Sequence, residues 1–274
     1  MNMKQRILGT VLGRLAMKMR DRIEIVRIAL FKEESAGTIT NDWMATFLLT
    51  KICQPNKSFI DVGAHIGSII SEVSHYDPTI KIIAVEAMPD KALKLRSKFP
   101  FIELHECAVG ESNDGEITFY VNTKQSGYSS LGKPSKNNVS DTIEIKVLIK
   151  KLDSLITTDD IDVIKIDVEG AELGVLRGSE NILSNCRPVV MFESAPPQSD
   201  DDLGYTKNDM WEFFTNHKYE IFVPNRIAHN GPGLTMEGFS ESHIYPRRTT
   251  NYFAVPIERR VEVRDVARKI LNIT

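Results

Sequence analysis

Four acidic residues mark where chemistry could occur in this sequence of 274 residues, because each stands at or next to the end of a short apolar run. They are Asp61, Glu86, Asp167 and Glu193. Apolar runs of this length, separated by helical segments, are typical of buried strands in a parallel sheet. The carboxyl ends of parallel strands meet at one edge of the sheet, where ligands bind. We therefore expect the four carboxylates to share one ligand-binding edge.

The loop of residues 61–67 carries a glycine pattern that indicates the kind of ligand. Gly63 permits a tight turn, and Gly67 lets the backbone approach a ligand closely. The pattern is D-x-G-x-x-x-G, whereas dinucleotide-binding loops have G-x-G-x-x-G and direct a helix N-terminus at a pyrophosphate. The carboxylate of Asp61 would repel phosphate but suits a ligand with an ammonium and a sulfonium group. S-adenosylmethionine has both.

Glu86 adds a second contact for such a ligand, because it follows Gly67 by 19 residues and ends the next apolar run. An acid about 20 residues beyond the glycine loop accepts hydrogen bonds from ribose hydroxyls. We include its neighbour Ala87 in the predicted cofactor site. Cys107 and Ala108 close the third run, and their small side chains would leave room for an adenine ring. An ordinary strand ending explains these two residues nearly as well.

The alternation of apolar runs and helical segments predicts the fold that positions these residues. Expected strands are 58–62, 81–85, 101–107, 161–166, 187–192, 219–223 and 251–255, and expected helices include 68–75, 90–98, 171–176 and 206–217. Residues 116–121 and 141–147 alternate like half-exposed antiparallel strands. The prediction is a Rossmann-like α/β fold, a mostly parallel sheet flanked by helices with an antiparallel β insertion. We assign residues 1–50 to an N-terminal helical extension and 51–274 to a catalytic domain.

Composition narrows the function classes. Hydrophobic residues make up 42% of the chain and charged residues 26%, which is enough to bury a full core. The net charge of −3 gives no sign of a nucleic-acid partner. Cys53, Cys107 and Cys186 stand far apart, without the spacing of a metal site or a disulfide scaffold. We therefore expect a reduced, cytoplasmic protein.

The first 32 residues have a different character. They contain eight basic and only two acidic side chains, with apolar residues between them at helical spacing. Arg14 interrupts what would be the apolar core of a signal peptide. The pattern predicts an amphipathic helix, either docked on the domain with a solvated basic face or in peripheral contact with an anionic membrane or a partner.

Two later segments are candidates for contact with a substrate. Residues 125–131 could form a lid over the cofactor or acceptor, because long polar loops in compact domains are often functional. Residues 224–245 could form a wall of the acceptor site. Within that wall we expect His229 and His243 to be surface residues and not catalysts.

Four segments together resemble the FkbM-type methyltransferase family. They are residues 59–67, 107–110, 151–155 and 164–172. The resemblance covers roughly residues 57–222 and implies a class I methyltransferase fold that binds S-adenosylmethionine. It also implies O-methylation of a sugar, a glycan or a polyketide-like natural product. His65 departs from the family, which usually has Asn there; because either side chain can hydrogen-bond, we keep His65 in the predicted cofactor site.

Asp167 and Glu169 are the candidate catalytic residues, and Asp167 is also included in the predicted cofactor site. An alcohol that accepts a methyl group benefits from a general base, and Gly170 lets the chain turn sharply just after these acids. Glu193 and His65 are held in reserve for the same role. The acids could instead cap and stabilise the following helix. They could also hold a divalent cation, but the sequence shows no clear third ligand, so no metal is predicted.

Two other functions compete with methyl transfer. An NAD-dependent oxidoreductase could use Glu86 to hold a ribose, although the glycine pattern and Asp61 count against it. A methyltransferase-like domain without catalytic activity could serve as a binding module, an idea supported only by the basic N-terminal segment. The acceptor and the oligomeric state cannot be read from the residues.

Overall fold

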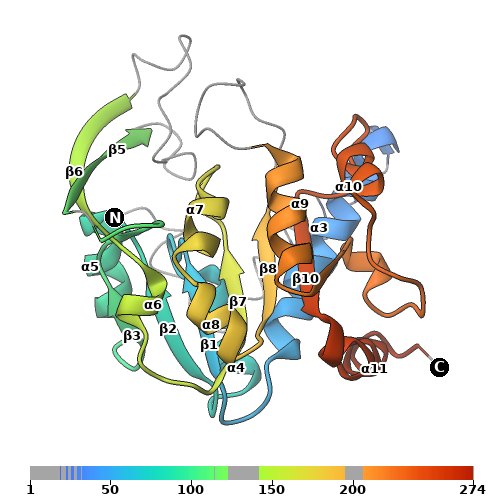
Figure 1. The fold of residues 1–274 in the computed structure, drawn as a ribbon, viewed down its shortest axis with the longest axis horizontal. Helices are drawn as coiled ribbons and strands as arrows, with labels where there is room; N and C mark the ends of the chain where they lie inside the picture. Colours follow the sequence, from blue (N-terminus) through green and yellow to red (C-terminus); the bar gives the residue numbers. More distant parts are fainter. Residues whose placement is uncertain are drawn as a thin grey trace.

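The computed structural model describes residues 33–113, 115–122, 142–194 and 206–273, together with positions 19, 23, 26, 27, 30 and 31. Its centre is a seven-stranded sheet in the order β3-β2-β1-β7-β8-β10-β9 (Figure 1). Neighbouring strands are parallel except at β10, which is antiparallel to β8 and β9. The strands are β1 (Ser58–Val62), β2 (Lys81–Val85), β3 (Glu103–His105), β7 (Ile161–Ile166), β8 (Val189–Glu193), β9 (Tyr219–Phe222) and β10 (Asn251–Pro256). This arrangement confirms the predicted α/β class.

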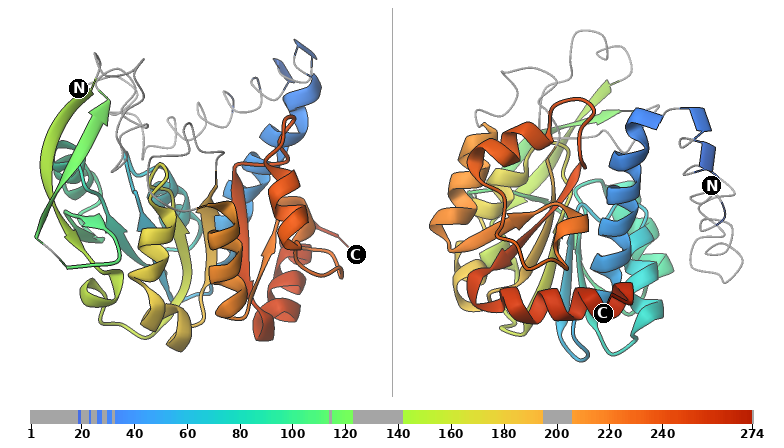
Figure 2. Two further views of the ribbon diagram at one scale, coloured as in Figure 1. Left: turned by 45° about the horizontal axis from the view of Figure 1, so that its top comes forward. Right: turned by 90° about the vertical axis from the view of Figure 1, so that its right-hand side faces the viewer.

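Helices cover both faces of the sheet (Figures 1 and 2), as expected for strands that are apolar on both sides. One face packs against α6 (Leu152–Leu155), α7 (Glu172–Arg177), α8 (Glu180–Asn185), α9 (Lys207–Asn216) and α10 (Met236–Ser242). The other packs against α3 (Glu33–Ile52), α4 (Ser68–Tyr76), α5 (Pro89–Lys98) and α11 (Arg260–Leu271), and short 3-10 turns, η3 (Pro224–Arg226) and η4 (Ile257–Arg259), follow β9 and β10. Along β1, Ile60 faces the first core and Phe59 the second.

Helix α3 falls largely within the stretch assigned to an N-terminal extension, and it is built into the core. Its Ala45, Leu48 and Leu49 are completely buried and share a hydrophobic cluster with Phe59 of β1. Most of residues 1–32, the expected amphipathic helix, lie outside the described part of the chain. None of the described helices combines the length and the apolar character needed to cross a membrane.

A small second sheet stands beside the first and contains the predicted antiparallel insertion. It has the order β4-β6-β5, with β4 (Ala108–Val109), β5 (Glu116–Asn122) and β6 (Thr142–Lys150). The pairing of β5 with β6 is antiparallel, as predicted. The expected strand 101–107 was too long: β3 ends at His105, because the chain leaves the main sheet there and joins β6 through β4. The candidate lid, residues 125–131, lies outside the described residues.

Candidate functional site

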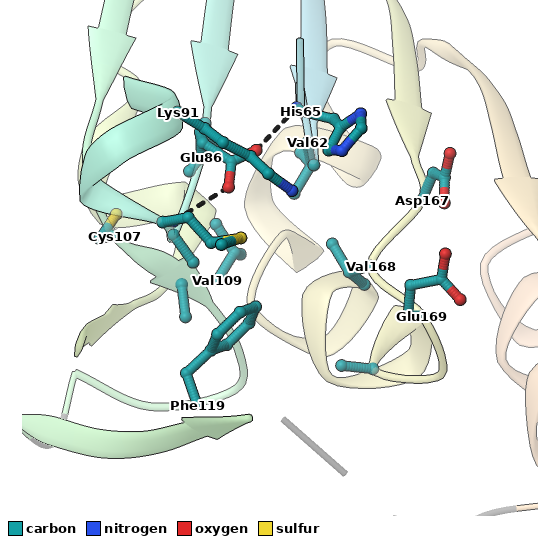
Figure 3. A pocket seen from close by; sticks show the side chains of 16 residues that line it. Val62, His65, Glu86, Lys91, Cys107, Val109, Phe119, Asp167, Val168 and Glu169 are labelled. Atoms are coloured by element: carbon teal, nitrogen blue, oxygen red, sulfur yellow. Dashed lines mark hydrogen bonds between the residues drawn. The ribbon is translucent and has the colours of Figure 1, made fainter. Parts of the chain in front are cut away.

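A cavity opens at the carboxyl ends of β1, β2 and β7, the edge at which the sequence placed the site (Figure 3). Eight of the predicted site residues line it: Gly63, His65, Glu86, Ala87, Cys107, Ala108, Asp167 and Glu169. Asp61 and Gly67 were predicted with them but are not part of the lining. The remaining lining residues, which sequence reasoning missed, are Val62, Val85, Met88, Lys91, Val109, Phe119, Val168 and Ala171.

The loops after β1 and β7 touch each other through glycine. Gly63 has a φ of 82°, and a Cβ atom there would lie 1.9 Å from the backbone oxygen of Asp167. Only glycine both adopts this positive φ readily and leaves room for the Asp167 backbone, because it has no Cβ atom. Gly67, with a φ of 78°, faces away from this contact, and a Cβ atom there would meet the Phe99 ring at 2.4 Å. Gly63 therefore seats one loop on the other, while Gly67 allows α4 to pack against α5.

Two non-glycine residues of the cavity wall also have left-handed backbones. His65 has a φ of 50° and Glu169 a φ of 54°. Such residues are uncommon and concentrate at functional sites, where the surrounding structure holds them in place. Because His and Asn both tolerate this conformation, the departure of His65 from the family pattern leaves the loop geometry intact. Burial and the nearby Lys91 lower the pKa of His65 to about 4, so its ring is neutral at neutral pH.

Glu86 is fixed by the backbone around it. Its Oε2 accepts a hydrogen bond of 2.7 Å from the His65 amide, and its Oε1 one of 2.9 Å from the Met88 amide (Figure 3). Burial raises the pKa of Glu86, while these hydrogen bonds and Lys91 oppose that rise. Each carboxylate oxygen retains a second lone pair. The side chain is therefore a rigid acceptor at the cavity wall, suited to neighbouring hydroxyl groups.

A buried cation lies behind the cavity. Lys165 Nζ is 3.1 Å from Asp61 Oδ1 and 3.3 Å from Asp167 Oδ2, and it donates to the carbonyl of Gly63 at 3.3 Å. The first contact follows from strand register, because Asp61 and Lys165 are direct partners in the β1–β7 pairing. Burial disfavours the charge on Lys165, but the two carboxylates outweigh it and raise the pKa of the ammonium.

Three carboxyl groups cluster beyond this cation. Oxygens of Asp167, Glu169 and Glu193 lie within 4.8 Å of one another. Burial and the adjacent Asp167 raise the pKa of Glu193 to about 10. Burial opposes ionisation of Asp167, but Lys165 and the hydrogen bond from Glu193 outweigh it, so the pKa of Asp167 lies below its usual value. At neutral pH Glu193 is therefore protonated and donates to an ionised Asp167.

Glu169 is the member of this cluster with a pKa near neutrality. Burial raises its pKa to about 7, with added repulsion from Asp167 and Glu172. Glu172 also shapes the turn, because its Oε1 accepts hydrogen bonds of 3.2 Å from the Val168 amide and 3.1 Å from the Gly170 amide. Glu169 thus lies at the cavity wall with a pKa near neutral pH, which suits a general base.

The apolar wall comes from the second sheet, which the sequence did not connect with the site. Phe119 of β5 lines the cavity opposite β1 and packs in a hydrophobic cluster with Met88 and Ala108 (Figure 3). The alternation of residues 116–121 placed Phe119 on an apolar face, but only the tertiary structure shows what that face covers. Together with Cys107 and Ala108, this wall suits a flat ring.

The prediction that His243 lies on the surface was wrong. Its ring is buried, with Nδ1 2.8 Å from the carbonyl of Phe239 and Nε2 2.9 Å from Ser194 Oγ. Burial lowers its pKa to about 4. Because Ser194 directly follows Glu193, His243 anchors the chain as it leaves β8. His229 is exposed, as expected.

Comparison with known proteins agrees with this geometry. The model of the methyltransferase FkbM domain matches residues 61–221. This chain belongs to the FkbM methyltransferase family. The match confirms the family resemblance and the class I methyltransferase fold. It also shows that the FkbM domain includes the glycine loop, the second sheet and the carboxyl cluster.

Individual relatives of this FkbM domain are distant. It is 25% identical over 150 residues to Methyltransferase 1 of Beauveria bassiana (strain ARSEF 2860), a match that covers 46% of this chain and 60% of that protein. Among solved structures it is similar to the methyltransferase FkbM of Methylobacillus flagellatus KT, with 18% identity, a TM-score of 0.41 and coverage of 72% of this chain and 43% of that one. A putative methyltransferase of Haloferax volcanii, solved with the activator Trm112, gives 10% identity, a TM-score of 0.43 and coverage of 85% and 98%.

We predict that Lys165→Met lowers the free energy of unfolding by about 3–5 kcal/mol, because it leaves Asp61 buried without its cation. The folded-state pKa of Asp61 then rises further above its unfolded value, so the loss grows with rising pH and shrinks as the pH falls. Urea unfolding at several pH values measures this. Lys94→Met is the matched control, since Lys94 pairs with Asp90 on the surface at 2.9 Å and should cost about 1 kcal/mol or less. Equal losses in both variants would contradict the prediction.

Proposed function

We propose that the cavity binds S-adenosylmethionine and that the chain transfers its methyl group to a hydroxyl oxygen of a sugar, a glycan or a natural product. One observation carries the proposal. The same cavity joins Glu86, a fixed carboxylate suited to ribose hydroxyls, to Glu169, a carboxylate whose pKa is about 7. The first explains the binding of a nucleoside cofactor, and the second supplies a base for the acceptor.

The residues present fit the cofactor. Glu86 would accept hydrogen bonds from the ribose, and the wall formed by Met88, Cys107, Ala108 and Phe119 would enclose the adenine. Asp61 is only 1% exposed, and within the described chain neither of its carboxylate oxygens accepts a well-aligned hydrogen bond despite the close Lys165. Because Asp61 and Asp167 share the single ammonium of Lys165, the group keeps negative charge beside the glycine loop, and a ligand with an ammonium and a sulfonium would gain from it. When bound, S-adenosylmethionine supplies a methyl group already activated by its sulfonium.

Glu169 would act on the acceptor. An alcohol has a high pKa and becomes a better nucleophile when a base accepts its proton as the new bond forms. When bound, the cofactor would supply its methyl group to the acceptor oxygen, and a Glu169 oxygen would accept the proton that the alcohol loses. Glu193 keeps its own proton and donates it in a hydrogen bond to the ionised Asp167, which leaves Glu169 as the acid in this cluster that can take up a proton near neutral pH.

The base favours a hydroxyl over an amine acceptor. A neutral amine already has a free lone pair and gains little from a carboxylate with a pKa of about 7. The fold also argues against an NAD enzyme. The classic dinucleotide sheet has the order 3-2-1-4-5-6, whereas here the antiparallel β10 stands between β8 and β9.

Calorimetric titration with S-adenosylhomocysteine, with NAD as the paired ligand, tests the cofactor. We expect binding of the former alone. Glu86→Ala should weaken it by about a hundredfold, because two hydrogen bonds to a charged group are lost. Glu86→Gln, which keeps one carbonyl acceptor, should retain part of the affinity. Glu106→Ala, at an exposed acid, serves as the control and should bind like the unaltered chain. Binding of NAD, or unchanged affinity in Glu86→Ala, would refute the assignment.

We expect Glu169→Gln to lower kcat by about a hundredfold or more while cofactor affinity is retained. In the unaltered enzyme kcat/KM should rise with pH through a pKa of about 7, as Glu169 loses its proton, and this limb should vanish in the variant. An acceptor found by screening sugars and glycans gives the rate. Glu180→Gln, at an exposed acid on α8, is the matched control. If both variants keep the same rate and pH profile, Glu169 is not the base; if no acceptor is methylated although the cofactor binds, the binding-module function gains support.

Removal of metal ions with a chelator tests whether a cation or a proton offsets the negative charge of the carboxyl cluster. The spacing of Asp167, Glu169 and Glu193 would also suit a divalent cation, with Glu193 as the third ligand that the sequence did not reveal. We expect methyl transfer to continue after treatment with EDTA, because the proton held between Glu193 and Asp167 already lowers the charge. Activity that is lost with EDTA and restored by magnesium would show instead that the cluster holds a metal.

A further inference from the structure

One corner of the molecule carries apolar side chains exposed to an unusual degree. Among the described residues the four most exposed large apolar side chains are Phe31 at 79%, Tyr245 at 70%, and Leu30 and Ile244 at 66% each. Single exposed apolar residues are ordinary, but a contiguous group marks an interaction surface. These four belong to two segments more than 200 positions apart in the sequence.

Hydrogen bonds bring the two segments together. Tyr245 donates to Glu34 Oε2 at 2.8 Å, and Thr38 donates to the carbonyl of Arg247. Glu34 follows Leu30 and Phe31 by about one helical turn. Helix α10 ends just before Ile244 and Tyr245. Figures 1 and 2 show this helix beside the N-terminal end of α3. The four side chains therefore lie on one corner, which we call the apolar corner.

The helical positions before α3 extend this surface. Met19, Ile23 and Val26 are helical and 56%, 63% and 57% exposed. Together with Leu30 they are spaced by four, three and four residues, which in a helix puts them on one stripe. Exposure of such an apolar stripe to water is unfavourable in free energy. The stripe therefore indicates a partner that buries apolar side chains.

Charge identifies the class of partner. Arg27, Arg247 and Arg248 stand within three residues of the apolar corner in the sequence, and Arg27 and Arg248 are exposed. The first 32 residues contain eight basic and two acidic side chains, whereas the whole chain contains 34 and 37. The rest of the chain is therefore acidic and would be repelled by a negatively charged surface. A helix with an apolar stripe and a basic polar face is typical of binding at the interface of an anionic bilayer.

We propose that the apolar corner and the stripe of Met19, Ile23, Val26 and Leu30 dock the protein on an anionic phospholipid bilayer. The apolar side chains enter the boundary between headgroups and acyl chains, and the arginines contact the phosphates. None of these residues lines the cofactor cavity. The proposal is independent of the methyl-transfer chemistry and concerns where that chemistry takes place.

Co-sedimentation of the full chain with vesicles tests the proposal. We expect binding to vesicles of phosphatidylcholine mixed with phosphatidylglycerol, little binding to phosphatidylcholine alone, and weakening by salt. The double variant Phe31→Ser with Ile244→Ser should lose about tenfold or more of the affinity. Leu93→Ser with Val261→Ser, at side chains that are 65% and 59% exposed elsewhere on the surface, is the matched control and should bind like the unaltered chain.

Three results would overturn the docking surface. They are equal loss of binding in the two double variants, equal binding to neutral and anionic vesicles, and no binding of the unaltered chain to either. Thermal unfolding and binding of S-adenosylhomocysteine should be the same in both double variants and in the unaltered chain. These controls separate a lost membrane contact from a misfolded protein and from a failed cofactor assignment.

Discussion

The contact of Lys165 with Asp61 and Asp167 is the interaction on which the site depends. A lone carboxylate as deeply buried as Asp61 would be very costly, and the ammonium opposite it in strand register offsets that cost. The same ammonium keeps Asp167 ionised, and an ionised Asp167 keeps the proton on Glu193. The charge of each of these groups at the sheet edge thus determines whether its neighbour is protonated. The result is a neutral Glu193 and a Glu169 with a pKa of about 7, both beside Asp167 in one cluster of carboxyl groups.

Much of the main sheet was predictable from the residues, because strands buried on both faces are continuous apolar runs. β1, β2 and β7 match the expected strands residue for residue. The glycine loop and Glu86 were predictable for a different reason, since backbone geometry and a strand ending leave a local mark in the sequence. The third strand was overextended, since nothing local in residues 101–107 shows that the chain changes sheet after His105.

What the sequence could not give was pairing between distant segments. Lys165 stands in the strand Ile161–Ile166, and only the register of β1 against β7 reveals its partner. The signal available was a lysine in a strand whose only other charged residue is Asp162, which predicts a buried acid near Lys165. Phe119 and His243 were missed for the same reason. Their environments are made by the small sheet and by α10, and neither is visible from neighbouring residues.

The small sheet has a consequence for how a ligand enters and leaves. The small sheet packs around a third hydrophobic cluster, which contains Phe119, Met88 and Ala108. This cluster is separate from the two clusters that hold the main sheet together. A unit with its own small core opens at a lower free energy than the whole domain. One wall of the cavity can therefore unfold locally while the other stays folded. A ligand bound between them would link the two walls, so we expect occupancy of the cavity to slow amide hydrogen exchange in β5 and β6.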